Sequence, residues 1–232
     1  MSRQAETLAK IRLFRSLDAA AIRDLDTQCT WRRASHNSWI IDYQDPSNDM
    51  FFVVSGTVRV KIQSVSGREI LLTEISAGGC FGEIAAIDNQ SRSSGIMAVT
   101  DVTIARMPAS VFRAAVHAHP DVCDQVLALI AGQVRMLTNR VNEFTTLDVR
   151  HRIYSELLRL SRPEAARAKE RVISPPPVHA DIAARVSTRR EAVAREFKAL
   201  EREGLMERRR GAIVLTDPEK LRRSIEKATE LD

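Results

Sequence analysis

The sequence predicts an α+β chain in three parts: an N-terminal antiparallel β jelly roll or barrel, a long helix, and a C-terminal winged helix-turn-helix. Short β-rich runs between turn signals fill residues 31–107. An apolar heptad pattern follows, and residues 180–215 have the order helix, turn, helix and basic hairpin. We therefore expect a barrel domain over residues 1–118, a dimerisation helix over 119–147 and a C-terminal domain over 148–232.

The barrel is predicted from runs rich in β-branched and aromatic residues. These runs are residues 39–41, 50–54, 57–62, 70–75 and 96–107, and Asp-Pro, Ser-Gly and Gly-Gly turn signals separate them. Short strands at such regular spacing are typical of an antiparallel barrel or jelly roll. The amphipathic residues 8–25 are expected to pack as helix against the strands.

The long helix is predicted to open at His119-Pro120-Asp121, because the residues that follow contain no proline and a single glycine, Gly132. Its apolar residues alternate spacings of four and three, as in a coiled-coil seam. The seam residues are Cys123, Leu127, Ile130, Val134, Leu137, Val141 and Phe144. A core helix can show two heptads by chance, whereas three on a helix of about 27 residues between two domains favour a homodimer.

In the C-terminal domain, Val193, Phe197 and Leu200 recur at helical spacing as a core stripe. The opposite face carries charge, at Glu191, Arg195, Lys198 and Arg202. Before this helix pair, residues 161–177 are interpreted as a linker around one strand candidate, Val172-Ile173. One packed face and one charged face make double-stranded DNA the expected partner.

The distribution of charge agrees with this expectation. Residues 148–232 carry 20 Lys and Arg against 15 Asp and Glu, whereas residues 1–147 carry 15 of each, so the whole net charge of +5 lies in the C-terminal part. A polyanion is expected to bind there, although such an excess can also serve solubility alone.

Several classes of site and location are excluded by composition. Cys29, Cys80 and Cys123 are widely spaced, which argues against a disulfide framework or a four-cysteine metal site and fits a reducing cytoplasm. The five histidines are scattered, so no metal cluster and no Ser-His-Asp or Cys-His catalytic arrangement is predicted. No signal-peptide core and no apolar run near ~20 residues occurs, so no membrane contact is expected.

One compact group of residues in the barrel predicts a ligand site. Glycines near Gly82 allow close approach of backbone, and a short helix starting near Glu83 would present amides to an anion. Arg92 can clamp phosphate oxygens, Ser93 can donate a hydroxyl, and Glu83 can accept from sugar hydroxyls. These parts match a phosphorylated sugar, and a surface salt bridge between Glu83 and Arg92 is the competing interpretation.

Several motifs in the same order resemble the cyclic AMP receptor protein branch of the CRP/FNR family of transcription regulators. They are FFVVSGTVRVKI at residues 51–62, Phe81-Gly82-Glu83-Ile84-Ala85 followed by Arg92-Ser93, the long helix, Leu147-Asp148-Val149, and Arg190-Glu191-x-x-x-Arg195. The resemblance covers nearly the whole chain. It implies a cyclic-nucleotide-binding barrel, a dimer, double-stranded DNA and RNA polymerase as partners, and no enzymatic activity.

By this resemblance, cyclic AMP or cyclic GMP would act as an allosteric ligand without a metal. Glu83 would hold the ribose 2′-hydroxyl and Arg92 the cyclic phosphate, with Ser93 and the amides near Gly82, Ile84 and Ala85 as further donors. Thr138 would meet the purine. Leu137 departs from the family pattern, since a polar purine contact is expected in its place, and both nucleotides therefore remain open.

On DNA, Arg190, Glu191 and Arg195 would by resemblance contact a TGTGA-like half-site, since Arg matches guanine and Glu accepts from cytosine. The alternative for Glu191 is a capping box with Thr188. The phosphate contacts expected are Lys198, Arg202 and residues 208–210, unless these are solvated.

Two other functions remain for the chain. One is a CRP/FNR-type regulator that binds DNA without a cyclic nucleotide or senses another small molecule. The other is an enzyme built on a jelly roll, which the scattered histidines disfavour.

Overall fold

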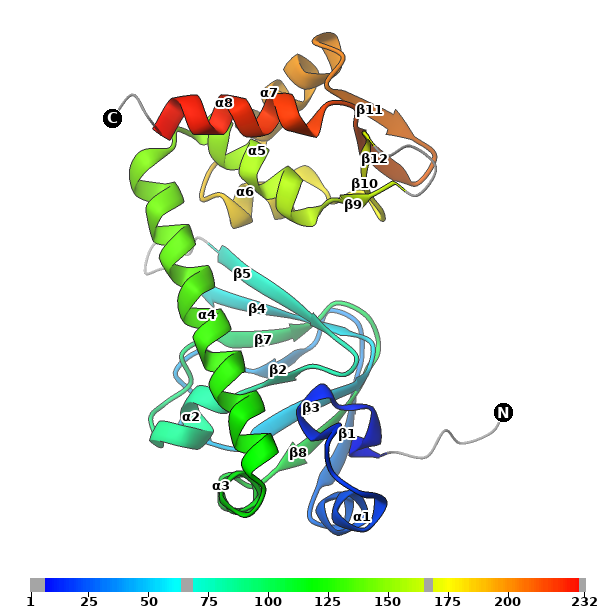
Figure 1. The fold of residues 1–232 in the computed structure, drawn as a ribbon, viewed down its shortest axis with the longest axis vertical. Coiled ribbons are helices and arrows are strands. Elements are labelled where there is room, and N and C mark those ends of the chain that lie inside the picture. Colours follow the sequence, from blue (N-terminus) through cyan, green and yellow to red (C-terminus); the bar gives the residue numbers. More distant parts are fainter. Residues whose placement is uncertain (1–6, 64–68, 165–168, 230–232) are drawn as a thin grey trace. The chain divides into compact units, whose positions relative to one another are not determined.

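The computed structural model describes residues 7–63, 69–164 and 169–229 (Figure 1). The chain divides into two compact units, residues 1–133 and 134–232, and the division falls within the long helix α4, Pro120–Thr146. The expected domain boundaries after residues 118 and 147 stay a prediction. Across the described ranges, no helix has both the length and the apolar character needed to cross a bilayer.

Two antiparallel sheets form the described body of the first unit, which confirms the predicted jelly roll. One sheet has the order β1 (Thr30–Ala34), β8 (Val102–Met107), β3 (Met50–Ser55) and β6 (Cys80–Phe81). The other has the order β2 (Trp39–Ile41), β7 (Gly95–Ala98), β4 (Thr57–Gln63) and β5 (Glu69–Ser76).

Strand β3 shows how the two-residue period of a strand builds two cores. Phe51 and Val53 are buried in a cluster with residues of both sheets. Met50 and Phe52 point to the opposite face and pack with the helices. These helices are η1 (Leu8–Lys10), η2 (Arg12–Phe14), α1 (Ala19–Thr27), α3 (Ala109–Ala118) and the first part of α4.

The strand prediction was wrong in detail at three places. Strand β1 was not among the expected runs, the first of which began at residue 39. The expected run 96–107 is two strands, because β7 ends at Ala98 and β8 begins at Val102 in the other sheet. Strand β6 was not expected, since two residues are too short to show an alternating pattern. It forms through pairing with β3, in which Phe81 lies opposite Phe51.

The second unit contains the predicted winged helix-turn-helix. Its helices are α5 (Val149–Leu160), α6 (His179–Arg185), α7 (Arg190–Arg202) and α8 (Pro218–Thr229). Val193, Phe197 and Leu200 of α7 are buried in its core, as their spacing predicted. In the turn between α6 and α7, Ser187 adopts a φ of 53°, and the Thr188 amide donates to Ala183 O at 2.9 Å.

Residues 161–177 are more than the linker that the sequence suggested. Their strands β9 (Arg162–Pro163) and β10 (Arg171–Ile173) join the hairpin β11 (Met206–Arg209) and β12 (Ala212–Leu215) in one sheet of order β11-β12-β10-β9. The strand candidate Val172-Ile173 is confirmed. The sheet was not predicted, because β10 pairs with β12, about forty residues further along the chain.

Helix α4 has one packed face and one open face. Val122 and Val126 are buried in the core of the first unit. The seam residues are more open: Leu127, Val134, Leu137, Val141 and Phe144 are 37 to 63% exposed in the single chain. A row of large apolar side chains at heptad spacing is rarely left exposed to solvent, and it usually marks a surface that another protein chain covers.

Candidate functional site

The glycine that opens the predicted ligand site is sterically required. Gly82 precedes α2 (Glu83–Asp88) with a φ of 86°. A Cβ atom there would lie 2.6 Å from Arg92 Nη1 and 2.9 Å from Asp49 O. Only glycine therefore lets the start of α2, with the Ile84 and Ala85 amides in its first turn, lie this close to Arg92.

Arg92 is buried within the first unit, with 3% of its surface exposed. Its guanidinium donates to Gly82 O (3.3 Å), Asp49 O (2.8 Å) and the Ser47 hydroxyl (3.1 Å). It also lies over the Phe51 ring, 5.4 Å from the centroid. All these hydrogen-bond acceptors are neutral, and in the described part of the chain Arg92 forms no ion pair.

Burial has the largest influence on the pKa of the Arg92 guanidinium. Desolvation lowers the pKa of its guanidinium, and the charges of Asp49, Asp45 and Glu83 oppose this shift without cancelling it. A buried cation with only neutral acceptors lacks its best partner. A phosphate group would supply the missing negative charge, so the residues present fit a phosphorylated ligand.

Glu83 is buried beside this cation, with 6% of its surface exposed, and does not form the surface salt bridge that competed with the ligand interpretation. Its carboxylate accepts instead from Gln133 Nε2 of α4 at 2.7 Å. A carboxylate can accept several hydrogen bonds, so Glu83 can keep Gln133 and still receive a sugar hydroxyl.

The other predicted nucleotide contacts differ in position. Ala85 is buried, Ile84 is exposed on α2, and Ser93 is exposed next to Arg92. Thr138 belongs to the second unit, on an exposed part of α4, where its hydroxyl donates to Val134 O at 2.9 Å. A purine contact of Thr138 stays a prediction.

Sequence reasoning missed the loop that holds Arg92. The Arg92 amide donates to Asp45 O at 3.0 Å and its carbonyl accepts from the Gln44 amide at 3.1 Å, so the loop pairs with the Arg92 segment. Ser47 and Asp49 supply the acceptors for the guanidinium. The Asp45-Pro46-Ser47 turn was visible in the sequence, but its contact with residue 92 was not, because more than forty residues separate them.

The four predicted DNA contacts lie on α7 of the second unit. Arg190, Glu191, Arg195 and Lys198 are all exposed, and within the described residues none of them forms a hydrogen bond or an ion pair. The capping box is not formed, because Arg189 is the N-cap of α7 and no side chain caps the helix.

The basic hairpin differs from the helix, since two of its three arginines are paired. Arg208 donates to Glu201 at 2.6 Å, and Arg209 forms ion pairs with Glu170 (2.9 Å) and Glu207 (3.1 Å). Arg210 is exposed. A phosphate contact by Arg208 or Arg209 would therefore compete with a carboxylate.

The structure places an aspartate, a histidine and a serine in a row, as in a catalytic triad, which the sequence did not suggest. His151 Nδ1 lies 2.8 Å from Asp148 Oδ1, and its Nε2 lies 3.2 Å from the Ser224 hydroxyl, 73 residues away in the sequence. Ser224 lies inside α8, where backbone amides are used in helical hydrogen bonds. The row therefore offers no free amides for an oxyanion, and it serves to join α8 to the start of α5.

Two of the three cysteines lie in surroundings that disfavour the thiolate. Burial raises the pKa of the Cys29 and Cys80 thiols to about 12, and the nearby charges of Asp26 and Glu83 act in the same direction. Both therefore stay protonated at neutral pH. No group of three or more potential metal-ligating side chains comes together in residues 7–63, 69–164 or 169–229.

Comparison with known families matches both halves of the chain. The cyclic nucleotide-binding domain matches residues 31–119, and the Crp-like helix-turn-helix domain matches residues 151–224. The chain belongs to the CRP/FNR family of transcription regulators. The jelly-roll enzyme is excluded, since the curated relatives are transcription regulators and the C-terminal match is a Crp-like helix-turn-helix domain.

Relatives support the assignment over most of the chain. A CRP-like cAMP-activated global transcriptional regulator of Mycobacterium tuberculosis is 26% identical over 68% of this chain and 70% of its own length. The cAMP-activated global transcriptional regulator Vfr of Pseudomonas aeruginosa is 27% identical over 77% and 85%.

Solved structures show the same fold. A CooA variant from Carboxydothermus hydrogenoformans has a TM-score of 0.78 at 19% identity and covers 92% of this chain and 94% of its own. The c-di-GMP responsive global regulator CLP from Xanthomonas campestris has a TM-score of 0.72 at 22% identity, with 85% and 99% covered.

The two glycines Gly82 and Gly132 should respond oppositely to alanine. Gly82→Ala should destabilise the protein by at least about 1 to 2 kcal/mol, because a left-handed φ disfavours a Cβ and the site leaves no room for one. Gly132→Ala should stabilise it by about 0.5 to 1 kcal/mol, because Gly132 lies inside α4 with nothing within 4 Å. Urea unfolding followed by circular dichroism measures both, and equal effects would contradict the steric account.

Proposed function

We propose that the protein is a homodimeric, cyclic-nucleotide-responsive transcription regulator that binds palindromic DNA with TGTGA-like half-sites. The observation that carries the proposal is the buried Arg92 guanidinium, which has only neutral hydrogen-bond acceptors and lies beside the buried Glu83 carboxylate. It would act in the cytoplasm, on DNA, with RNA polymerase as its further partner.

The proposed ligand roles follow from the chemistry of each group. Arg92 would bind the cyclic phosphate and Glu83 the ribose 2′-hydroxyl, with Ser93 and the amides of Gly82, Ile84 and Ala85 as additional donors. Thr138 would contact the purine. The relatives from Mycobacterium tuberculosis and Pseudomonas aeruginosa are described as cAMP-activated, which favours cyclic AMP over cyclic GMP.

The exposed seam of α4 supports a homodimer. A second copy of the chain would cover the apolar side chains from Leu127 to Phe144 by the same heptad pattern. In a two-fold dimer, recognition helices can contact successive major grooves when they lie ~34 Å apart. A ligand that binds better to this arrangement would shift the population toward it.

The exposed charged face of α7 supports DNA recognition. Arg190, Glu191 and Arg195 would contact base edges, and Lys198 a phosphate. Since these side chains have no partner within the described residues, binding DNA would not require any internal ion pair of α7 to break.

A regulator that answers to another small molecule is the second candidate. Arg92 is already held by three acceptors of the protein, so it can be kept in place without a phosphate. The structural relative CLP is described as c-di-GMP responsive, although the likeness to it extends to the fold alone.

Nucleotide and DNA should strengthen each other's binding. Fluorescence anisotropy on a TGTGA-type palindrome should show DNA affinity rising by about 5- to 150-fold with saturating cyclic AMP. Arg92→Leu should abolish this rise and leave the basal DNA affinity, whereas Arg32→Leu, an exposed arginine of β1, should retain it. Equal DNA affinity of the wild type with no nucleotide, cyclic AMP and cyclic GMP would refute nucleotide dependence.

Base and phosphate contacts on α7 should be separable. Arg195→Ala should cost ~1 to 3 kcal/mol on the palindrome and relax preference at one base pair. Lys198→Ala should weaken all sequences alike and reduce the salt dependence of binding. A randomised half-site library measures both, and uniform loss in the two variants would rule out direct readout by Arg195.

The seam should be sensitive to charge. Val141→Glu would place like charges in an apolar interface, where an unpaired buried charge costs several kcal/mol, so light scattering should show a monomer. Asn142→Glu introduces the same charge at the next exposed residue, off the seam, and should stay dimeric. A stable Val141→Glu dimer would refute this interface.

A further inference from the structure

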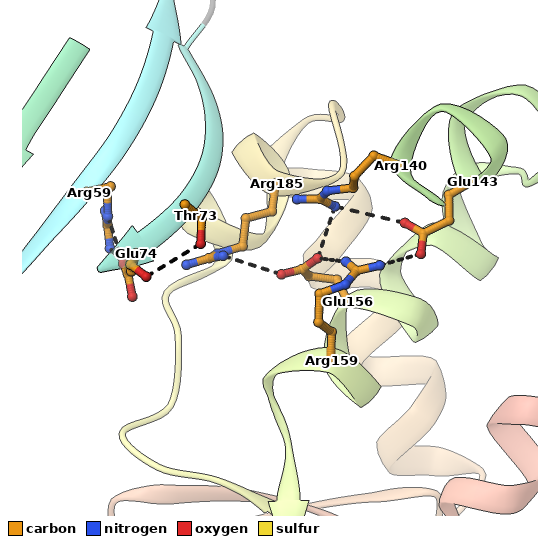
Figure 2. Close-up of polar contacts among 8 residues, drawn as sticks. All are labelled: Arg59, Thr73, Glu74, Arg140, Glu143, Glu156, Arg159 and Arg185. Carbon is orange, nitrogen blue, oxygen red and sulfur yellow. Dashed lines mark hydrogen bonds and ion pairs between the residues drawn. The ribbon is translucent and has the colours of Figure 1, made fainter. Parts of the chain in front are cut away.

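The second unit contains a carboxylate that has no contact with solvent. Glu156 of α5 is 0% exposed, and arginines of three different helices surround it (Figure 2). The Glu156 cluster consists of Arg140 and Glu143 of α4, Glu156 and Arg159 of α5, and Arg185 of α6. All five residues belong to residues 134–232.

The contacts of the cluster cross from one helix to the next. Arg140 donates to Glu156 Oε2 at 3.1 Å, and Arg185 forms an ion pair with Oε1 at 3.5 Å. Arg159 contacts both Glu156 and Glu143, so it lies between the carboxylates of α4 and α5. Figure 2 shows these groups converging on Glu156.

Two of these ion pairs bridge the joint between α4 and α5. Helix α4 ends at Thr146 and α5 begins at Val149, so two residues connect them. Arg140 to Glu156 and Glu143 to Arg159 tie the two helices together on either side of this short connection. Arg152 of α5 adds a third tie, with its guanidinium 5.1 Å from the Phe144 ring centroid of α4.

A buried ion-pair cluster of this kind adds little net stability, but it can fix the relative orientation of the helices that carry it. Moving a carboxylate out of water is costly, and the attraction of its partners offsets that cost only when all of them are in place. A rotation between α4 and α5 would separate Glu156 from Arg140 while it stayed buried. The cluster therefore penalises a change in the angle between the two helices.

The cluster also reaches the helix-turn-helix, since Arg185 is at the end of α6, directly before the turn that leads to α7. A second network in the same unit makes no such link to α4. In that network, Tyr154 and Arg150 of α5 bind Glu196 of α7, at 2.7 Å and 3.0 Å. The Glu156 cluster, by contrast, is an ion-pair network that includes α4, α5 and α6 at once.

We propose that Arg140, Glu143 and Glu156 are positioning residues that transmit the state of α4 to the recognition helix, through the joint between α4 and α5. The inference rests on the proposed function, because it assigns the path by which a nucleotide would change DNA affinity. In this role the residues would act through the helices, without a contact of their own to nucleotide or DNA. Their role is to make α6 and α7 follow any change in α4.

The test is the coupling factor, the ratio of DNA dissociation constants without and with saturating cyclic AMP, measured by anisotropy on the full-length protein. Arg140→Met with Glu143→Gln removes both ion pairs across the joint and leaves Glu156 with Arg159 and Arg185. In this double variant the coupling factor should fall to within about twofold of one. Cyclic AMP affinity by calorimetry and dimer mass by light scattering should be unchanged, which a general loss of structure would not allow.

Glu196→Gln is the matched control, since it removes a partly buried carboxylate of the same unit that has no link to α4. It should keep the wild-type coupling factor. A double variant that couples as strongly as the wild type would overturn this inference alone. A wild type with a coupling factor of one would overturn the proposed nucleotide dependence, and this inference with it.

Discussion

Burial of the Arg92 guanidinium constrains the whole first unit. A cation out of contact with water needs acceptors on all sides, and two separate segments supply them: Gly82 at the start of α2, and the loop carrying Ser47 and Asp49. This requirement excludes a side chain at Gly82 and brings the loop against the Arg92 segment. The sheets hold these segments in register, since Phe51 of β3 pairs with Phe81 directly before Gly82.

The two units bury opposite charges in different ways, and the difference distinguishes the proposed ligand site around Arg92 from the proposed joint around Glu156. Arg92 has neutral acceptors, so its charge remains available to an incoming anion. Glu156 has three arginines, so its charge is already compensated and an additional ligand would gain little. A buried ionised group without a counter-charge in the protein thus indicates ligand binding. One whose counter-charge is supplied by the protein indicates a role in positioning.

Helices α4 and α7 are alike in having buried apolar side chains on one face and exposed side chains on another. In α7, Phe197 is buried while Arg195 and Lys198 are exposed, so the helix can be held rigidly and still present its charges. In α4, Val126 is buried while Val134 and Val141 are exposed. The open face of α7 is polar and that of α4 is apolar, which suits DNA for the first and a second protein chain for the second.

The sequence by itself determined features that depend on neighbours a few residues apart: the stripe of Val193, Phe197 and Leu200, the heptads of α4, the alternating strands and the order of the parts. Helix and strand periods are local, so they can be recognised without the fold. Only the tertiary structure decided which distant groups meet: Ser47 and Asp49 at Arg92, Gln133 at Glu83, β10 at β12, and Arg140 at Glu156. Each of these contacts joins segments that are far apart in the sequence. Which segments meet depends on the packing of the whole domain, and such a contact leaves no periodic pattern in the sequence.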